Sequence, residues 1–169
     1  LVTDGYISDS INAGYIFLGH QLDVQRLISD MKLFTPITQT TFIDRNIYRV
    51  KIPLEFIKNI IKINGIIRGN KVKQPSVLPE FILQENCPVP IIREFLAGMF
   101  GGDGHTCYIG KNTFTSISFS KSKIIAHLDT LKTMMINVKN LLAKVGIHNV
   151  TIQNEKVNTS SKTRANENK

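Results

Sequence analysis

The 169-residue chain is predicted to adopt an α+β fold of two similar units. Strand-like hairpins alternate with stretches of helical periodicity, and the same order of elements occurs in both halves. An Asp-Gly pair also recurs, at Asp4-Gly5 and at Asp103-Gly104, and the helical pattern around Leu27 has a counterpart around Leu128. A period near one hundred residues is too long for a solenoid repeat. It indicates two units related by a pseudo-twofold axis.

The first half is predicted to contain two hairpins, each followed by a helix. In the first helix, apolar residues recur at three- and four-residue steps from Val24 to Phe34, and Thr35-Pro36 ends the pattern. The expected elements are a hairpin over 5–19, this helix, strands 37–43 and 47–52 joined through Asp44-Arg45-Asn46, and a helix from Leu54 to Ile63.

The second half is predicted to repeat helix, hairpin and helix. Its long helix has Leu128, Leu131, Met135, Val138, Leu142 and Val145 on one face, and Gly146 ends it. The expected elements are a helix from Ile91 to Gly101, strands 105–110 and 113–120, this long helix, and strand-like sequence over 147–157. The predicted domains are a first unit over 1–75, a linker over 76–90, a second unit over 91–157 and a disordered polar tail over 158–169.

The charge balance favours a polyanionic partner. The chain carries 21 Lys and Arg against 13 Asp and Glu, a net charge of +8. Residues 1–90 contribute ten basic and eight acidic residues, and residues 91–169 contribute eleven and five, so most of the surplus lies in the second half. No apolar stretch is long enough to span a bilayer. Two cysteines without metal-ligand spacing indicate a reducing, intracellular compartment.

The stretch Phe95 to Gly104, with the sequence FLAGMFGGDG, is the most informative part of the chain. Ala97 and Gly101 are four residues apart, as are Gly98 and Gly102, so each pair lies on one side of a helix and permits close approach of a partner helix. Glycine within a helix costs about 0.5–1 kcal/mol relative to alanine. We therefore expect these glycines to serve a geometric purpose.

This stretch resembles the signature of the LAGLIDADG (dodecapeptide, DOD-type) homing endonucleases. Residues 96–98 and 103–104 match that signature letter for letter, Gly101 and Gly102 replace its usual Asp-Ala, and Leu1 to Gly5 resembles the end of a first copy. The resemblance covers about residues 1–157. It implies two pseudo-symmetric αββαββα units whose antiparallel sheets form a DNA-binding saddle.

The resemblance also implies a site and a reaction. Asp4 and Asp103 would be catalytic and would bind Mg²⁺ or Mn²⁺ with the carbonyls of Thr3 and Gly102. The reaction would be Mg²⁺-dependent hydrolysis of both strands of a long DNA target, by an enzyme encoded in a mobile intron or an intein. A basic catalytic residue is expected as well. Lys51 is the first candidate, followed by Lys121 and Lys123.

Strand alternation selects a DNA-facing set of residues. Along 47–52, Arg49 and Lys51 point away from the apolar side chains, whereas along 113–120 Ile117 and Phe119 suit the core. Two-stranded ribbons fit the major groove, where polar and basic side chains read bases or hold phosphates. The predicted set is Arg49, Lys51, Gln39, Thr41, Ser116, Ser118 and Ser120.

A non-cleaving nucleic-acid binder, such as an RNA maturase that assists splicing of its own intron, is the alternative function. The expected partners are double-stranded DNA or intron RNA, with no membrane, and the chain is expected to act as a pseudo-dimeric monomer. The composition also permits an organelle such as the mitochondrion. The chain begins without Met and retains little of a first signature helix, so we expect an inactive fragment.

Overall fold

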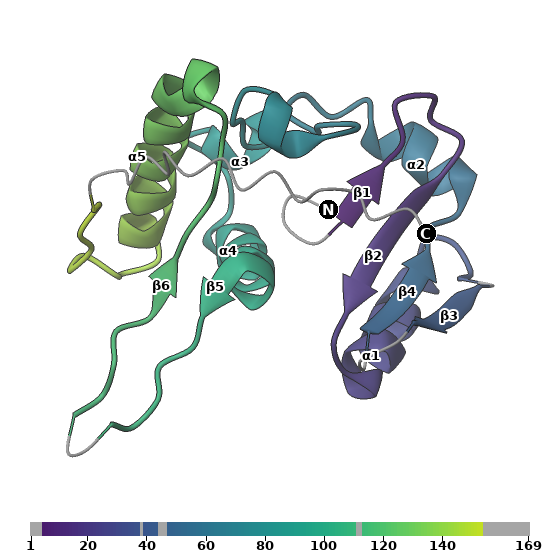
Figure 1. Cartoon of the computed structure of the whole chain (residues 1–169), viewed down its shortest axis with the longest axis horizontal. Helices are drawn as coiled ribbons and strands as arrows, with labels where there is room; N and C mark the ends of the chain where they lie inside the picture. Colours follow the sequence, from purple (N-terminus) through teal and green to yellow (C-terminus); the bar gives the residue numbers. More distant parts are fainter. Residues whose placement is uncertain (1–4, 38, 44–46, 111–112, 154–169) are drawn as a thin grey trace, which may run out of the picture.

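The chain adopts an α+β fold with antiparallel sheets, as predicted (Figure 1). The computed structural model describes residues 5–37, 39–43, 47–110 and 113–153. The strands described in the first half form one four-stranded sheet, whereas those described in the second half form a two-stranded one. The predicted pseudo-symmetric saddle is therefore not confirmed, and the predicted domain boundaries stay predictions.

The first half has the predicted order of elements. They are β1 (Gly5–Ile7), β2 (Gly14–Leu18), α1 (Gln21–Met31), β3 (Thr40–Ile43), β4 (Ile47–Lys51) and α2 (Leu54–Ile60). Helix α1 begins earlier than its apolar pattern because His20 caps it, with Nδ1 accepting the Leu22 N–H at 3.1 Å. The predicted turn at 44–46 lies outside the described residues.

The four strands pair in the order β1-β2-β4-β3, and every pair is antiparallel. Ile16 of β2 lies opposite Val50 of β4, and the next pair along is Phe17 with Arg49. Because side chains alternate along a strand, these two cross-strand pairs lie on opposite faces of the sheet. The register therefore separates an apolar face from a mixed aromatic and basic face.

The apolar face packs against α2. Ile7, Ile52 and Ile57 form a buried cluster, and Ile16 packs against it. At Gly14, a Cβ atom would lie only 2.6 Å from Ile57 Cδ1, so this glycine permits the close approach of helix and strand. Figure 1 shows α1 and α2 together on the far side of the sheet. Phe34, which follows α1, and Phe56 of α2 have ring centroids 6.2 Å apart.

The second half is mainly helical. The elements that follow the sheet and α2 are η1 (Lys71–Lys73), α3 (Glu80–Leu83), α4 (Val89–Asp103), β5 (Gly104–His105), β6 (Ser118–Phe119), η2 (Ile125–His127) and α5 (Leu128–Lys144), and the second half begins within α4. Helices α4 and α5 share a core with Leu78 and Ile82. Ile92, Leu96 and Met99 of α4 face Met134, Val138, Leu141 and Leu142 of α5. Both long helices were predicted, with bounds shifted by one or two residues.

The second hairpin is less regular than predicted. Strands were expected over 105–110 and 113–120, but in the described part of this hairpin only Gly104–His105 pairs with Ser118–Phe119, and Ile109 and Phe114 form an isolated bridge. Phe119 packs on Phe100 with ring centroids 5.4 Å apart, as a core residue should. The expectation of a buried Ile117 is wrong, because 66% of this residue is exposed. Residues 147–153 form no strand, and the predicted tail at 158–169 lies outside the described residues.

Hydrogen bonds join the segment around η1 to the residues that lead from the second hairpin into α5. We call this contact the polar seam and define it as residues 71–76 with residues 123–130. The Lys123 ammonium donates to the carbonyls of Lys71 and Gln74. The Ile124 N–H donates to the Val72 carbonyl at 3.3 Å, and the Ser76 N–H donates to Thr130 Oγ1 at 2.9 Å. The seam fixes the second half against the segment that follows the sheet.

None of the helices in the described part of the chain combines the length and the apolar character that a membrane span requires.

Gly65 offers a test of the join between the two halves. Its φ is +92°, and a Cβ atom there would lie 2.2 Å from the Leu78 carbonyl oxygen. We expect Gly65→Ala to lower the free energy of unfolding by at least about 1–3 kcal/mol, because backbone strain and the clash act together. Urea denaturation followed by circular dichroism measures this change.

Gly19→Ala is the matched control, because a Cβ atom at Gly19 would meet nothing within 4 Å. Equal urea midpoints for the two variants would contradict the expectation.

Candidate nucleic-acid interface

The sheet has one face that no described helix covers, and we call it the open face. Along each strand, its residues alternate with the residues that face α2. Tyr6, Tyr15 and Lys51 form one cross-strand row, and Phe17, Arg49 and Thr41 form the next. Gln39 lies just before β3, where its carbonyl accepts the Lys51 N–H at 3.0 Å. None of the described strand residues on this face is Asp or Glu.

Arg49 is held over an aromatic ring on the open face. Its guanidinium carbon lies 5.1 Å from the centroid of the Tyr15 ring, which is within cation–π distance. Arg49 is half-buried, whereas Lys51 and Thr41 are exposed. The ring of Tyr15 therefore limits the positions that the guanidinium group can take. The N–H groups of Arg49 can still reach a phosphate or a base.

The structure brings together four of the predicted interface residues, Arg49, Lys51, Gln39 and Thr41, on strands β3 and β4 and at their edge. Sequence analysis missed the aromatic members of the face. The signal was present, because Tyr15 and Phe17 alternate with Ile16 and Leu18 in β2. Ser116, Ser118 and Ser120 are exposed along the second hairpin, which projects away from α4 and α5 (Figure 1).

Asp103 is the last residue of α4, and its carboxylate forms an ion pair with Lys121. The two side chains are 26% and 15% exposed, so the pair is largely withdrawn from water. Lys51, the first candidate for a basic residue beside Asp103, lies instead on the open face. Lys121, the second candidate, is the lysine that the structure places at this carboxylate.

Lys123 has a structural role in the polar seam. Burial lowers the pKa of its ammonium group, and the neighbouring charge of Lys121 lowers it further. Its hydrogen bonds to the carbonyls of Lys71 and Gln74 oppose this cost of desolvation. Lys123 was a candidate for the basic catalytic residue, and in the structure its ammonium group donates to backbone carbonyls.

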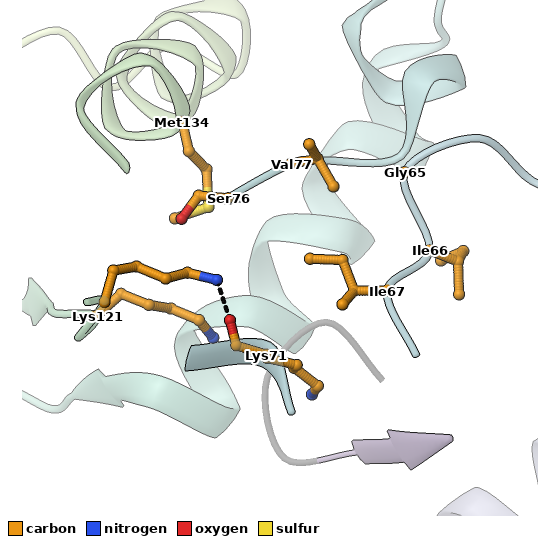
Figure 2. Close-up of a pocket in the computed structure, with 9 residues that line it drawn as sticks. Gly65, Ile66, Ile67, Lys71, Ser76, Val77, Lys121 and Met134 are labelled. Carbon is orange, nitrogen blue, oxygen red and sulfur yellow. Dashed lines mark hydrogen bonds between the residues drawn. The ribbon is translucent and has the colours of Figure 1, made fainter. Parts of the chain in front are cut away.

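A cavity lies beside these lysines, between the linker and the second half (Figure 2). Ile67, Lys71, Ser76, Lys121 and Met134 are among its lining residues. Its volume is about 20 Å³, which is close to the space that one water molecule needs. A nucleotide does not fit inside this cavity.

The small-residue side of α4 was predicted to pack against a partner helix. Ala97, Gly98 and Gly101 are exposed, and Cβ atoms built at the two glycines meet nothing within 4 Å. Gly102 is half-buried next to Asp103. In the described residues, no helix packs on this side of α4.

The predicted metal site falls partly outside the described residues, because Thr3 and Asp4 lie there. Among the residues that the structure does describe, no three His, Cys, Asp or Glu side chains gather as metal ligands. Among the described side chains, Asp103 is paired with the ammonium group of Lys121. Binding of Mg²⁺ or Mn²⁺ stays a prediction.

Comparison with known proteins gives three relatives, all archaeal and all named tRNA-splicing ligase RtcB. The protein of Methanopyrus kandleri is 32% identical, that of Pyrococcus furiosus 30% and that of Pyrococcus abyssi 34%, each over 83 residues. These residues are 49% of this chain but only 8–9% of the relatives. No protein-family model matches the chain.

These relatives contradict the functional predictions drawn from the signature-like stretch at residues 95–104. They are named as tRNA-splicing ligases, not as LAGLIDADG homing endonucleases. The predicted family, the DNA-hydrolysing activity, the intron or intein homing role and the RNA maturase alternative are corrected accordingly. Because the chain spans less than a tenth of these relatives, their activity as whole proteins is not thereby shown for it.

The ion pair of Asp103 and Lys121 can be tested by a double-mutant cycle with Asp103→Asn and Lys121→Met. We expect a coupling energy of about 0.5–3 kcal/mol, because each single substitution leaves the partner charge partly buried and unpaired. Urea denaturation of the four proteins measures it.

The pair of Lys58 and Glu55 is the control, with its charged atoms 3.8 Å apart and side chains 55% and 78% exposed. Its coupling should stay below about 0.5 kcal/mol. Equal coupling in the two cycles would show that burial does not strengthen the Asp103–Lys121 pair.

Proposed function

We propose that this chain is an RNA-binding segment that holds the phosphate backbone of RNA on the open face of its four-stranded sheet. The observation that carries the proposal is the adjacent placement of Arg49 and Lys51 on that face, with no Asp or Glu among its described strand residues. Arginine and lysine are the side chains that most often hold phosphates.

The overall charge supports the same partner. With a net charge of +8, the chain attracts a polyanion over a distance of about a Debye length before any specific contact forms. Phosphate contacts of this kind release counterions, so binding must weaken as salt rises. The cations of the open face supply the local positive charges that can make such phosphate contacts.

The relatives direct the proposal to RNA rather than to duplex DNA. Proteins named for tRNA splicing act on RNA, and 83 residues of this chain are about 30–34% identical to a part of each. We assign this chain a binding role only, because most of each relative has no counterpart here.

The exposed serines of the second hairpin are proposed as further contacts. Ser116, Ser118 and Ser120 recur at every second position, and each hydroxyl can donate to a phosphate oxygen. Gln39 and Thr41 would have the same role beside Arg49 and Lys51. These polar groups add hydrogen bonds, whereas the two cations add the dependence on salt.

The proposal is tested by fluorescence anisotropy with a labelled RNA that contains both a hairpin and single-stranded tails. We expect Arg49→Ala and Lys51→Ala each to weaken binding, and each to reduce the slope of log K against log salt by about 0.7–0.9 per lost phosphate contact.

Lys58→Ala is the control, because Lys58 lies on α2, on the other side of the sheet, and is similarly exposed. No binding of RNA by the wild-type chain, or equal losses in all three variants, would overturn the proposal. Stronger binding of a duplex DNA of the same length would overturn the assignment of RNA as the partner.

A further inference from the structure

Three aromatic rings lie among the cations of the open face. Tyr6 is 40% exposed and Phe17 is 36% exposed, while Tyr15 lies half-buried beneath the guanidinium group of Arg49. Aromatic residues usually bury their rings, and the other face of the sheet offers an apolar core next to them. The exposed position of these rings therefore needs an explanation other than core packing.

The register sets two of the three rings directly opposite a cation. Tyr6 lies opposite Tyr15, and Tyr15 lies opposite Lys51, while Phe17 lies opposite Arg49 in the next row. Directly opposite side chains on one face have Cβ atoms about 4.5–5.5 Å apart. The rings of β1 and β2 thus lie next to the two cations of β4.

We propose that the open face binds single-stranded RNA, with unpaired bases stacked on the rings of Tyr6 and Phe17 and the backbone held by Arg49 and Lys51. This inference rests on the proposed RNA-binding function and names the form of RNA that the same face takes. The third ring, Tyr15, positions Arg49, whose planar guanidinium group extends the stacking surface.

The chemistry of the face favours a single strand over a duplex. A paired base has its two faces covered by its neighbours in the helix, so a ring on a protein surface cannot stack on it. An unpaired base exposes both faces, and four-stranded sheets with exposed aromatic residues are a known platform for such bases. The cations provide charge complementarity to the backbone, which a stack of rings alone lacks.

Phe42 provides a matched control within the same sheet. It is 59% exposed, but it alternates with Thr41 along β3 and so belongs to the opposite face, where its ring contacts Tyr48 at 5.2 Å. Substitution of Phe42 removes an exposed ring from the sheet without changing the open face.

The experiment compares two labelled RNAs by fluorescence anisotropy: a single strand without self-complementarity, and a duplex that contains this strand. We expect Phe17→Leu and Tyr6→Leu each to weaken binding of the single strand about fivefold or more, since stacking on one base is worth about 1–3 kcal/mol. Binding of the duplex should not change, and Phe42→Leu should bind both RNAs as the wild type does.

Phe17→Trp gives a second measurement that does not depend on loss of binding. The chain contains no other Trp, so the emission of the introduced indole reports on the open face, and stacking of a base should quench it. We expect quenching by the single strand and none by the duplex.

The different failures can be told apart. If the wild-type chain binds neither RNA, the proposed function itself is overturned. If it binds RNA but prefers the duplex, or if the leucine variants keep full affinity and the single strand leaves the emission of Phe17→Trp unchanged, only the stacking inference is overturned. The urea midpoint of each variant shows whether it is folded. Where a leucine variant is unfolded, the emission of Phe17→Trp decides the result.

Discussion

The alternation of side chains along β2 and β4 is the constraint on which the rest of the structure depends. Helix α2 needs an apolar surface, and Ile16 and Ile52 supply it on one face of the sheet. The residues between them must then point the other way. Aromatic and basic residues occupy those positions, so the burial of one face determines the chemistry of the other. A shift of register by one residue would bury the cations and expose the core.

Local patterns in the sequence predicted most of the helices and strands, because each of them depends mainly on the spacing of apolar residues within it. Apolar residues at helical spacing predicted α5, and alternation predicted β4, where Arg49 and Lys51 share one face as expected. The second hairpin was predicted less well. Ile117 has the apolar character of a core residue, but its hairpin extends beyond α4 and α5, so no core reaches it. Burial of that kind depends on tertiary contacts that alternation alone does not specify.

The residues of the candidate site were likewise predicted only in part. The basic residues of the open face could be predicted, because charge and alternation are both visible in the sequence. The ion pair of Asp103 with Lys121 was not predicted, because it joins residues from a helix end and a loop that are distant in the sequence. The signature-like stretch at residues 95–104 predicted the helix that ends at Asp103, but the activity inferred from it is contradicted by the relatives. A short motif thus indicated local structure more reliably than function.

The polar seam has a consequence for how the chain unfolds. The two apolar clusters, one beneath the sheet and one between α4 and α5, are separate, and hydrogen bonds rather than shared apolar surface connect residues 71–76 to residues 123–130. Hydrogen bonds contribute little net free energy when water can replace them. Each cluster can therefore open as its own cooperative unit, and amide hydrogens at the seam, such as that of the exposed Ile124, would exchange with solvent before those in either core.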